Sequence, residues 1–209
     1  RLWQFLRGLW RRSPHTVYFL GASALFRDGL AGVFSFGAVL AAGTFGMSDT
    51  EVAIFGIVAS IIAGVSTIAF GLLDDRIGPK RVIMLSLVVL IVVGLAIFVF
   101  HDGGEPVFWA LGLVMTAFVG PAQSASRSYL ARIIPEGQAG ELFGLYATTG
   151  RSVSFLSPAA FAFFIWLGSV ITGSDDTQYW GILGIGLVLL AGLAVLIPVK
   201  DPDAVVAGD

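Results

Sequence analysis

Long apolar runs separated by short polar clusters dominate the pattern of this chain. Runs of roughly 20 or more apolar residues, the length of a helix that crosses a membrane, recur six times. They cover residues 14–45, 51–73, 80–100, 106–134, 141–171 and 178–198. The runs are too long, and lack the polar face, for helices of a soluble domain. The pattern therefore predicts an all-α, polytopic membrane protein with a six-helix transmembrane bundle over residues 14–198.

Helix-start and turn signals separate these runs. Ser48 and Glu51 have the spacing of a capping box, which predicts a helix start after the first short turn. Gly78 and Pro79 form a breaker followed by a residue suited to a first helical turn. Polar clusters at residues 101–106 and 173–176 mark the remaining outer turns.

Composition excludes most other classes of protein. Apolar residues make up 56% of the chain and charged residues 12%, whereas soluble domains are about a quarter charged. The formal net charge of -2 gives no electrostatic case for nucleic acid as a partner. The chain has no cysteine, and His15 and His101 lie apart at span ends. No metal-ligand cluster, phosphate-binding loop or nucleophile–base pair is visible, so we expect no enzyme, no cofactor and no metal site.

Lysine and arginine fall on one side of the predicted membrane. With the N-terminus inside, the cytoplasmic segments hold Arg1, Arg7, Arg11, Arg12, Arg76, Lys80, Arg81, Arg127, Arg132 and Lys200. The ionised residues of the outer loops are all acidic, namely Asp49, Glu51, Asp102, Glu105, Asp175 and Asp176. The positive-inside rule then places both termini in the cytoplasm. Residues 1–13 read as a basic amphipathic connector helix at the inner surface, and residues 199–209 as a cytoplasmic tail.

Polar residues are distributed unevenly among the six spans. The third span from Val82 to Phe100 and the sixth from Trp180 to Val199 contain no ionisable residue, so we expect both to be peripheral and to face mostly lipid. Charge at membrane depth must face protein or a wet cavity. We therefore expect the first, fourth and fifth spans to enclose a substrate or proton pathway. Its candidate residues are Asp28, Arg27, Arg151, Gln123 and Arg127.

Spacing suggests how these residues meet. Asp28 lies about 14 residues and Arg151 about 10 residues from the inner ends of their spans, which gives both a similar depth near the bilayer centre. Such a pair is either functional, with Asp28 titrating beside a fixed cation, or a structural ion pair. Arg27 and Arg151 would suit a carboxylate, and Gln123 and Arg127 share one helix face. On the second span, Gly56, Ser60 and Gly64 form a small-residue stripe for close helix contact.

The loop after the second span carries a recognisable string. Residues 71–81 read Gly-Leu-Leu-Asp-Asp-Arg-Ile-Gly-Pro-Lys-Arg. This string resembles the signature of the major facilitator superfamily between the second and third helices of a half, and the resemblance implies a gating loop. Its matching residues are Gly71, Asp75, Arg76, Gly78 and Arg81. Gly71 permits close helix approach and Gly78 a tight turn. Asp75 ends a helix, where a carboxylate needs a partner, either a basic side chain such as Arg76 or the N-terminus of a neighbouring helix.

Several further strings resemble the vacuole-effluxer-like branch of that superfamily, whose best-known members are autophagy-related permeases. They are Asp28-Gly29, residues 41–48, residues 73–78, residues 123–128 and residues 143–146. Their order implies the C-terminal six-helix half of a transporter. The basic leader from Arg1 would then connect to a missing N-terminal half.

The resemblance implies a secondary transporter that moves a small solute by alternating access. An amino acid or another carboxylate is the candidate substrate. The expected partners are the lipid bilayer, the small-molecule substrate, and either a missing N-terminal six-helix half or a second copy. The cell (inner) membrane of a bacterium is the expected location. The alternative is a membrane scaffold or subunit whose polar residues serve only as interhelical contacts.

Overall fold

The computed structural model describes residues 14–134 and 138–202. The helices in chain order are α2 (Pro14–Gly43), α3 (Asp49–Ile77), α4 (Pro79–Val99), α5 (Gly104–Ile133), α6 (Ala139–Ser152), α7 (Leu156–Thr172) and α8 (Gly181–Leu196). Short 3-10 turns, η1 (His101–Gly103) and η2 (Gln178–Trp180), precede α5 and α8. The expected connector helix over residues 1–13 lies outside the described residues.

The expectation of an all-α membrane protein is confirmed. In the described part of the chain, 6 helical segments are long and apolar enough to cross a membrane, with α6 and α7 together forming the fifth. The helix starts follow the sequence signals: Glu51 accepts a 2.7 Å hydrogen bond from the backbone N–H of Ser48, which completes the capping box. Gly78 links α3 to α4 with φ of 86°, a conformation that favours glycine.

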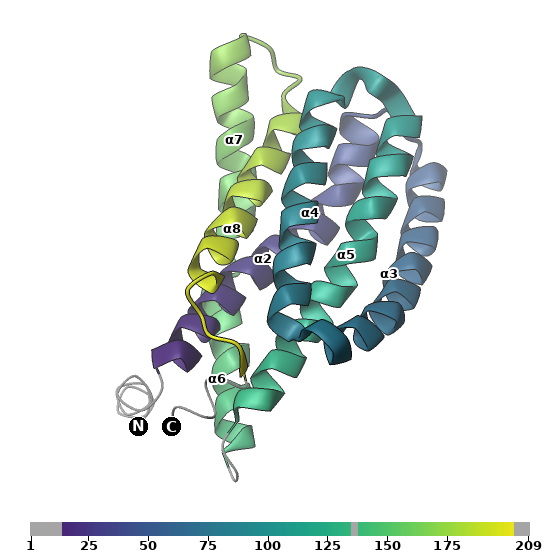
Figure 1. Cartoon of the computed structure of the whole chain (residues 1–209). Coiled ribbons are helices and arrows are strands. Elements are labelled where there is room, and N and C mark those ends of the chain that lie inside the picture. The colour runs from purple at the N-terminus through teal and green to yellow at the C-terminus, as the bar shows by residue number, and fades with distance from the viewer. Residues whose placement is uncertain (1–13, 135–137, 203–209) are drawn as a thin grey trace.

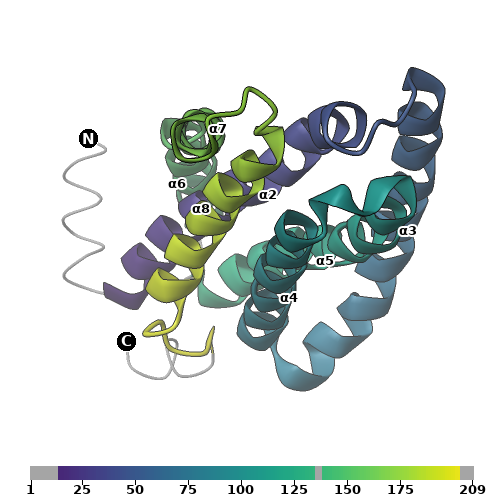
Figure 2. The ribbon, with the colours of Figure 1, turned by 90° about the horizontal axis from the view of Figure 1, so that it is seen from above.

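The bundle is built around α8, which packs against α2, α4 and α7, while α5 packs between α3 and α4. Figure 2 shows α3 at one edge of the bundle and α6 with α7 at the opposite edge. Two glycines of α8 permit close approach. A Cβ at Gly192 would lie 2.7 Å from the backbone nitrogen of Phe26, and one at Gly184 would lie 2.4 Å from the carbonyl oxygen of Ala160.

The expectation that the third and sixth spans mostly face lipid is wrong within this chain. In their most apolar windows, 44% of α4 and 50% of α8 are buried inside the bundle. An apolar surface packs against neighbouring helices as well as against lipid, and small residues decide where close packing occurs. Only one stripe of α4 is exposed, and it comprises Leu85, Val88, Val92, Leu95 and Val99.

The second span is the most exposed, since only 6% of its apolar window is buried. Its outward stripe comprises Ile54, Ile57, Ile61, Val65, Ile68 and Leu72. The predicted small-residue stripe makes no close helix contact within the described residues, because a Cβ at Gly56 or Gly64 would meet open space. A long apolar face of α3 is therefore left without a partner among the residues that the structure describes.

The fifth span is broken, although the sequence predicted one continuous helix over residues 141–171. The helix stops at Ser152 and restarts at Leu156 (Figure 1). Pro158 explains the position, because proline has no N–H to donate to the carbonyl of Ser154 and its ring clashes there. A break at membrane depth is tolerated only where neighbouring helices satisfy the freed backbone groups.

Candidate functional site

Asp28 satisfies the break in the fifth span. Its side chain is buried, with 6% of the residue exposed, and its carboxylate accepts a 2.6 Å hydrogen bond from the backbone N–H of Ser157. That N–H lies in the first turn of α7, where unpaired donors and the helix dipole stabilise negative charge. Asp28 thus acts as an N-terminal cap supplied by a different helix.

Arg27, the preceding residue, is held against α6. Its guanidinium lies 3.8 Å from the centre of the Tyr146 ring, and its Nη1 donates a 3.0 Å hydrogen bond to the Tyr146 carbonyl. The Tyr146 hydroxyl in turn forms a 2.8 Å hydrogen bond with the hydroxyl of Ser126 on α5. Tyr146 therefore joins α2, α5 and α6 around one half-buried cation.

The other predicted pathway residues flank this junction. Arg127 follows Ser126 on α5 and is exposed, while Gln123, one turn away, is half-buried. Arg151 is exposed near the end of α6. In the described part of the chain, Arg27, Arg127 and Arg151 form no ion pair.

The structure does not show the predicted pair between Asp28 and Arg151. The carboxylate of Asp28 bonds the Ser157 amide, and among the described residues no ion pair joins it to Arg151. Similar depth in two spans does not determine the direction in which each side chain points. Because the break at residues 153–155 exposes a backbone N–H, Asp28 finds a partner in the backbone instead.

The loop predicted to be a gating loop is tied through Arg132, not through Arg76. Arg132 Nη2 lies 3.3 Å from a carboxylate oxygen of Asp74 and 3.6 Å from one of Asp75. The side chain of Asp74 is 8% exposed and that of Asp75 is 78% exposed. A basic side chain does partner Asp75, as predicted, but it is Arg132 and not the example named, Arg76. Asp74, which the sequence argument did not consider, is the more buried partner of the same arginine. The Gly78–Asp74 backbone bond places Asp74 in the last turn of α3.

Other members of the loop are free or have unexpected partners. Arg76 and Arg81 are exposed and form no ion pair in the described ranges. A Cβ at Gly71 would meet open space, so the predicted close helix approach at this glycine is not seen in the described part of the chain. Lys80 instead donates to the carbonyls of Ile197, at 3.1 Å, and Val199. The start of α4 is thereby fastened to the end of α8, where a cation is favoured.

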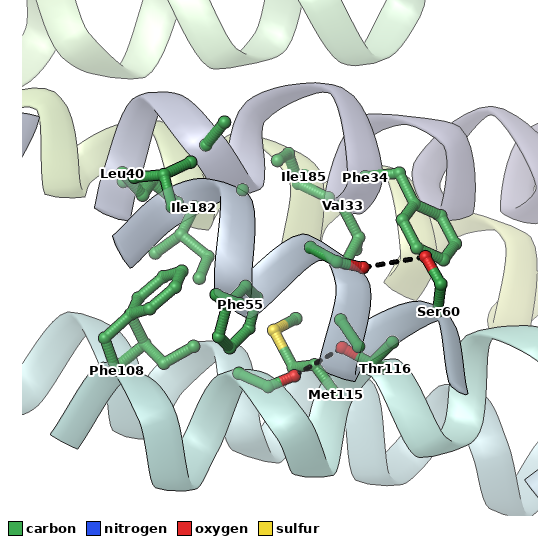
Figure 3. A pocket seen from close by; sticks show the side chains of 17 residues that line it. Val33, Phe34, Leu40, Phe55, Ser60, Phe108, Met115, Thr116, Ile182 and Ile185 are labelled. Carbon is green, nitrogen blue, oxygen red and sulfur yellow. Dashed lines mark hydrogen bonds between the residues drawn. The ribbon is translucent and has the colours of Figure 1, made fainter. Parts of the chain in front are cut away.

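A cavity of about 230 Å³ opens between α2, α3 and α5. Figure 3 shows Phe34 and Ser60 at one end of it and Leu40 and Phe108 at the other. The hydroxyls of Ser60 and Thr116, the two hydroxyl-bearing side chains in its lining, donate to the carbonyls of their own helices at 2.7 Å. The lining contains no charged side chain, so the cavity is an apolar one.

Comparison with known proteins decides the family. Residues 1–199 match the family described as "Vacuole effluxer Atg22 like". The chain belongs to this family. It is 26% identical to the "Uncharacterized MFS-type transporter YxiO" of Bacillus subtilis (strain 168), over 70% of this chain and 33% of the relative. It is 28% identical to "Autophagy-related protein 22" of Cryptococcus neoformans var. neoformans serotype D (strain JEC21 / ATCC MYA-565), over 93% of this chain and 35% of the relative.

Membership of the Atg22-like family confirms the resemblance seen in the loop and in the strings along the chain. It also confirms the expectation of a transporter-type membrane protein in place of an enzyme. The chain spans about a third of the length of the curated relatives it matches.

Proposed function

We propose that this chain forms one half of a secondary transporter, which moves a small anionic solute across a membrane by alternating access. The junction at Tyr146 is the observation that carries the proposal. It holds the guanidinium of Arg27 by a ring and a carbonyl, neither of which neutralises the charge. The neighbouring acid, Asp28, is committed to the α7 N-terminus.

The balance of charge around this junction favours an anion. Arg27, Arg127 and Arg151 lie on three different helices without an ion pair in the described residues. A cation at membrane depth needs a wet cavity or a counter-ion. Because Arg remains protonated and presents several donors in a planar fork, it suits a carboxylate group. An amino acid or another small carboxylate is therefore the substrate class that we propose.

The second half of the transporter is supplied by further polypeptide or by a second copy of this chain. The uncovered face of α3, with its exposed isoleucines and open glycines, is the surface we assign to it. Small residues permit close helix contact in a membrane. Alternating access by rocking of two halves about a site at their interface requires such a partner.

The charges of the loops support an orientation with both termini in the cytoplasm. Loop and helix-end cations such as Arg76, Arg81 and Arg132 lie at the opposite end of the bundle from the acidic turns containing Asp102 and Asp175. By the positive-inside rule the basic end faces the cytoplasm. A bacterial cell membrane is the location that we propose.

Flux measurements on the full-length protein that carries this chain test the proposal. Reconstituted in proteoliposomes, it should exchange at least one labelled small carboxylate across the membrane, and empty liposomes should not. A panel of solutes that includes neutral sugars and amines serves to define the substrate class. Absence of any flux from folded protein would favour the scaffold alternative, and flux confined to cations would contradict the anion assignment.

A further inference from the structure

The apolar cavity and the arginine junction lie along the same helix faces. On α2, Phe34 and Ala38 follow Arg27 by seven and eleven residues and so return to the same face. Ala31, Phe34 and Ala38 are exposed, and the last two line the cavity. Arg27, Ala31, Phe34 and Ala38 thus form an unburied line along α2 that leads from the guanidinium to the cavity, beside the fully buried Leu30.

Helix α5 carries a similar series of residues, in which the cavity residue comes first in the sequence and the polar residues follow. On α5, Gln123 and Arg127 follow the cavity residue Thr116 by seven and eleven residues. The hydrogen bond between Ser126 and Tyr146 sets this end of α5 at the level of Arg27. Both helices thus present polar or cationic groups at one level and apolar groups at the next.

We infer that the substrate is an amphipathic carboxylate, whose head group binds at Arg27 and whose hydrocarbon part enters the cavity between α2, α3 and α5. This inference rests on the proposed function and deepens it. Seven residues of helix separate Arg27 from Phe34, which is roughly 10 Å along the axis. A hydrocarbon tail must span that distance before it reaches the cavity.

The chemistry of the cavity agrees with a hydrocarbon occupant. The hydroxyls of Ser60 and Thr116 are already engaged with backbone carbonyls, and the aromatic and aliphatic side chains of Phe55, Met115 and Ile185 supply the remaining contacts (Figure 3). A cavity lined in this way remains dry and accepts apolar groups. The acyl chain of a membrane lipid has the same chemistry. The test must therefore distinguish a hydrocarbon tail whose carboxylate is bound at Arg27 from a lipid chain that binds in the cavity without Arg27.

Straight-chain carboxylates of increasing length provide the test. Acetate through decanoate would be titrated into the full-length protein in phosphatidylcholine nanodiscs, with binding measured by calorimetry. Affinity should stay flat for short acids and then rise about fourfold per methylene once the tail reaches the cavity. Arg27→Gln should weaken binding at every length, and decan-1-ol should bind far more weakly than decanoate.

Variants that fill the cavity give the second arm. A Cβ at Gly37 or Gly56 would meet open space, and both glycines line the cavity. Gly37→Leu, or Gly56→Leu if the first variant fails to fold, should bring the affinity for decanoate down to that for acetate. Gly21→Leu is the matched control, because Gly21 lies on α2 in open space away from the cavity. That control should keep the rise with length.

Three results would overturn the inference. Short acids that bind through Arg27 with no gain from added methylenes would remove the tail site and leave the proposed anion transporter standing. Decan-1-ol that binds as tightly as decanoate and ignores Arg27→Gln would show a free hydrocarbon or lipid site. Failure of carboxylates of every length to bind would defeat both the inference and the proposed anion substrate.

Discussion

The carboxylate of Asp28 on α2 and the backbone N–H of Ser157 on α7 are joined by a 2.6 Å hydrogen bond. This bond connects the first span to the break in the fifth, and it engages the acidic residue that directly follows Arg27 in the sequence. The separation of these two neighbouring charges, one turned to α7 and the other to α6, defines the candidate site.

Removal of the Asp28 side chain should destabilise the bundle. Asp28→Ala leaves the buried N–H of Ser157 without a partner, which should lower the free energy of unfolding by about 1–3 kcal/mol. Asp28→Asn should lower it less, because the amide oxygen can still accept the bond. Thermal unfolding in detergent measures both, with the exposed loop variant Asp175→Ala as control. Equal unfolding temperatures for all three variants would show that the bond contributes nothing.

In the predicted gating loop, Asp74 should contribute more to stability than Asp75. Asp74→Asn weakens a charge-assisted contact to Arg132 in a buried setting, with an expected loss of about 1–3 kcal/mol. Asp75→Asn removes an exposed contact, for which at most about 1 kcal/mol is expected. The free energy of unfolding of both variants, measured at low and high salt, compares the two contacts, since only the exposed Asp75 pair should respond strongly to salt. A larger effect of Asp75→Asn would contradict the assignment of Asp74 as the buried tie.

Tyr146 should tune substrate affinity through its ring. Tyr146→Leu removes the aromatic face above which the guanidinium of Arg27 lies, and affinity should fall roughly 2- to 30-fold. Tyr146→Phe keeps the ring and loses only the bond to Ser126, so its affinity should be closer to that of the native protein. Phe143→Leu on the same helix is the matched control, because Phe143 is exposed. Similar affinities for the Leu and Phe variants of Tyr146 would count against a cation–π role.

Water access distinguishes the residues of the predicted pathway from those of the packed core. This chain has no cysteine, so a cysteine introduced into it is its only thiol. Cysteines replacing Gln123, Arg127 and Arg151 should react with a membrane-impermeant maleimide, while one replacing the fully buried Ser157 should not. Protection of all three pathway positions from the maleimide, with and without substrate, would refute a wet pathway around the Tyr146 junction.

The spans, their starts and the family could be predicted because each depends on local sequence. The capping box at Ser48 and the positive φ at Gly78 follow from residue types over three or four positions. Hydropathy over a span reports membrane insertion directly. These features do not require knowledge of which helices meet.

The contacts of the site could not be predicted, because helical spacing gives a face and a depth but no partner. Asp28 and Arg151 had similar depths, yet the decisive group was a backbone N–H freed by a helix break. Pro158 was a visible signal for that break. The choice between Asp74 and Asp75 depends on which side of α3 meets α5, and adjacent residues point about 100° apart on a helix.

Substrate counterflow with Arg27 variants tests the central claim most directly. The full-length protein that carries this chain would be reconstituted in proteoliposomes loaded with unlabelled carboxylate, and entry of the labelled carboxylate would be followed. The native protein should concentrate label, Arg27→Lys should retain part of this activity, and Arg27→Gln should lose it while its unfolding temperature stays near native. Counterflow by Arg27→Gln at the native rate would contradict an anion transporter built around this guanidinium.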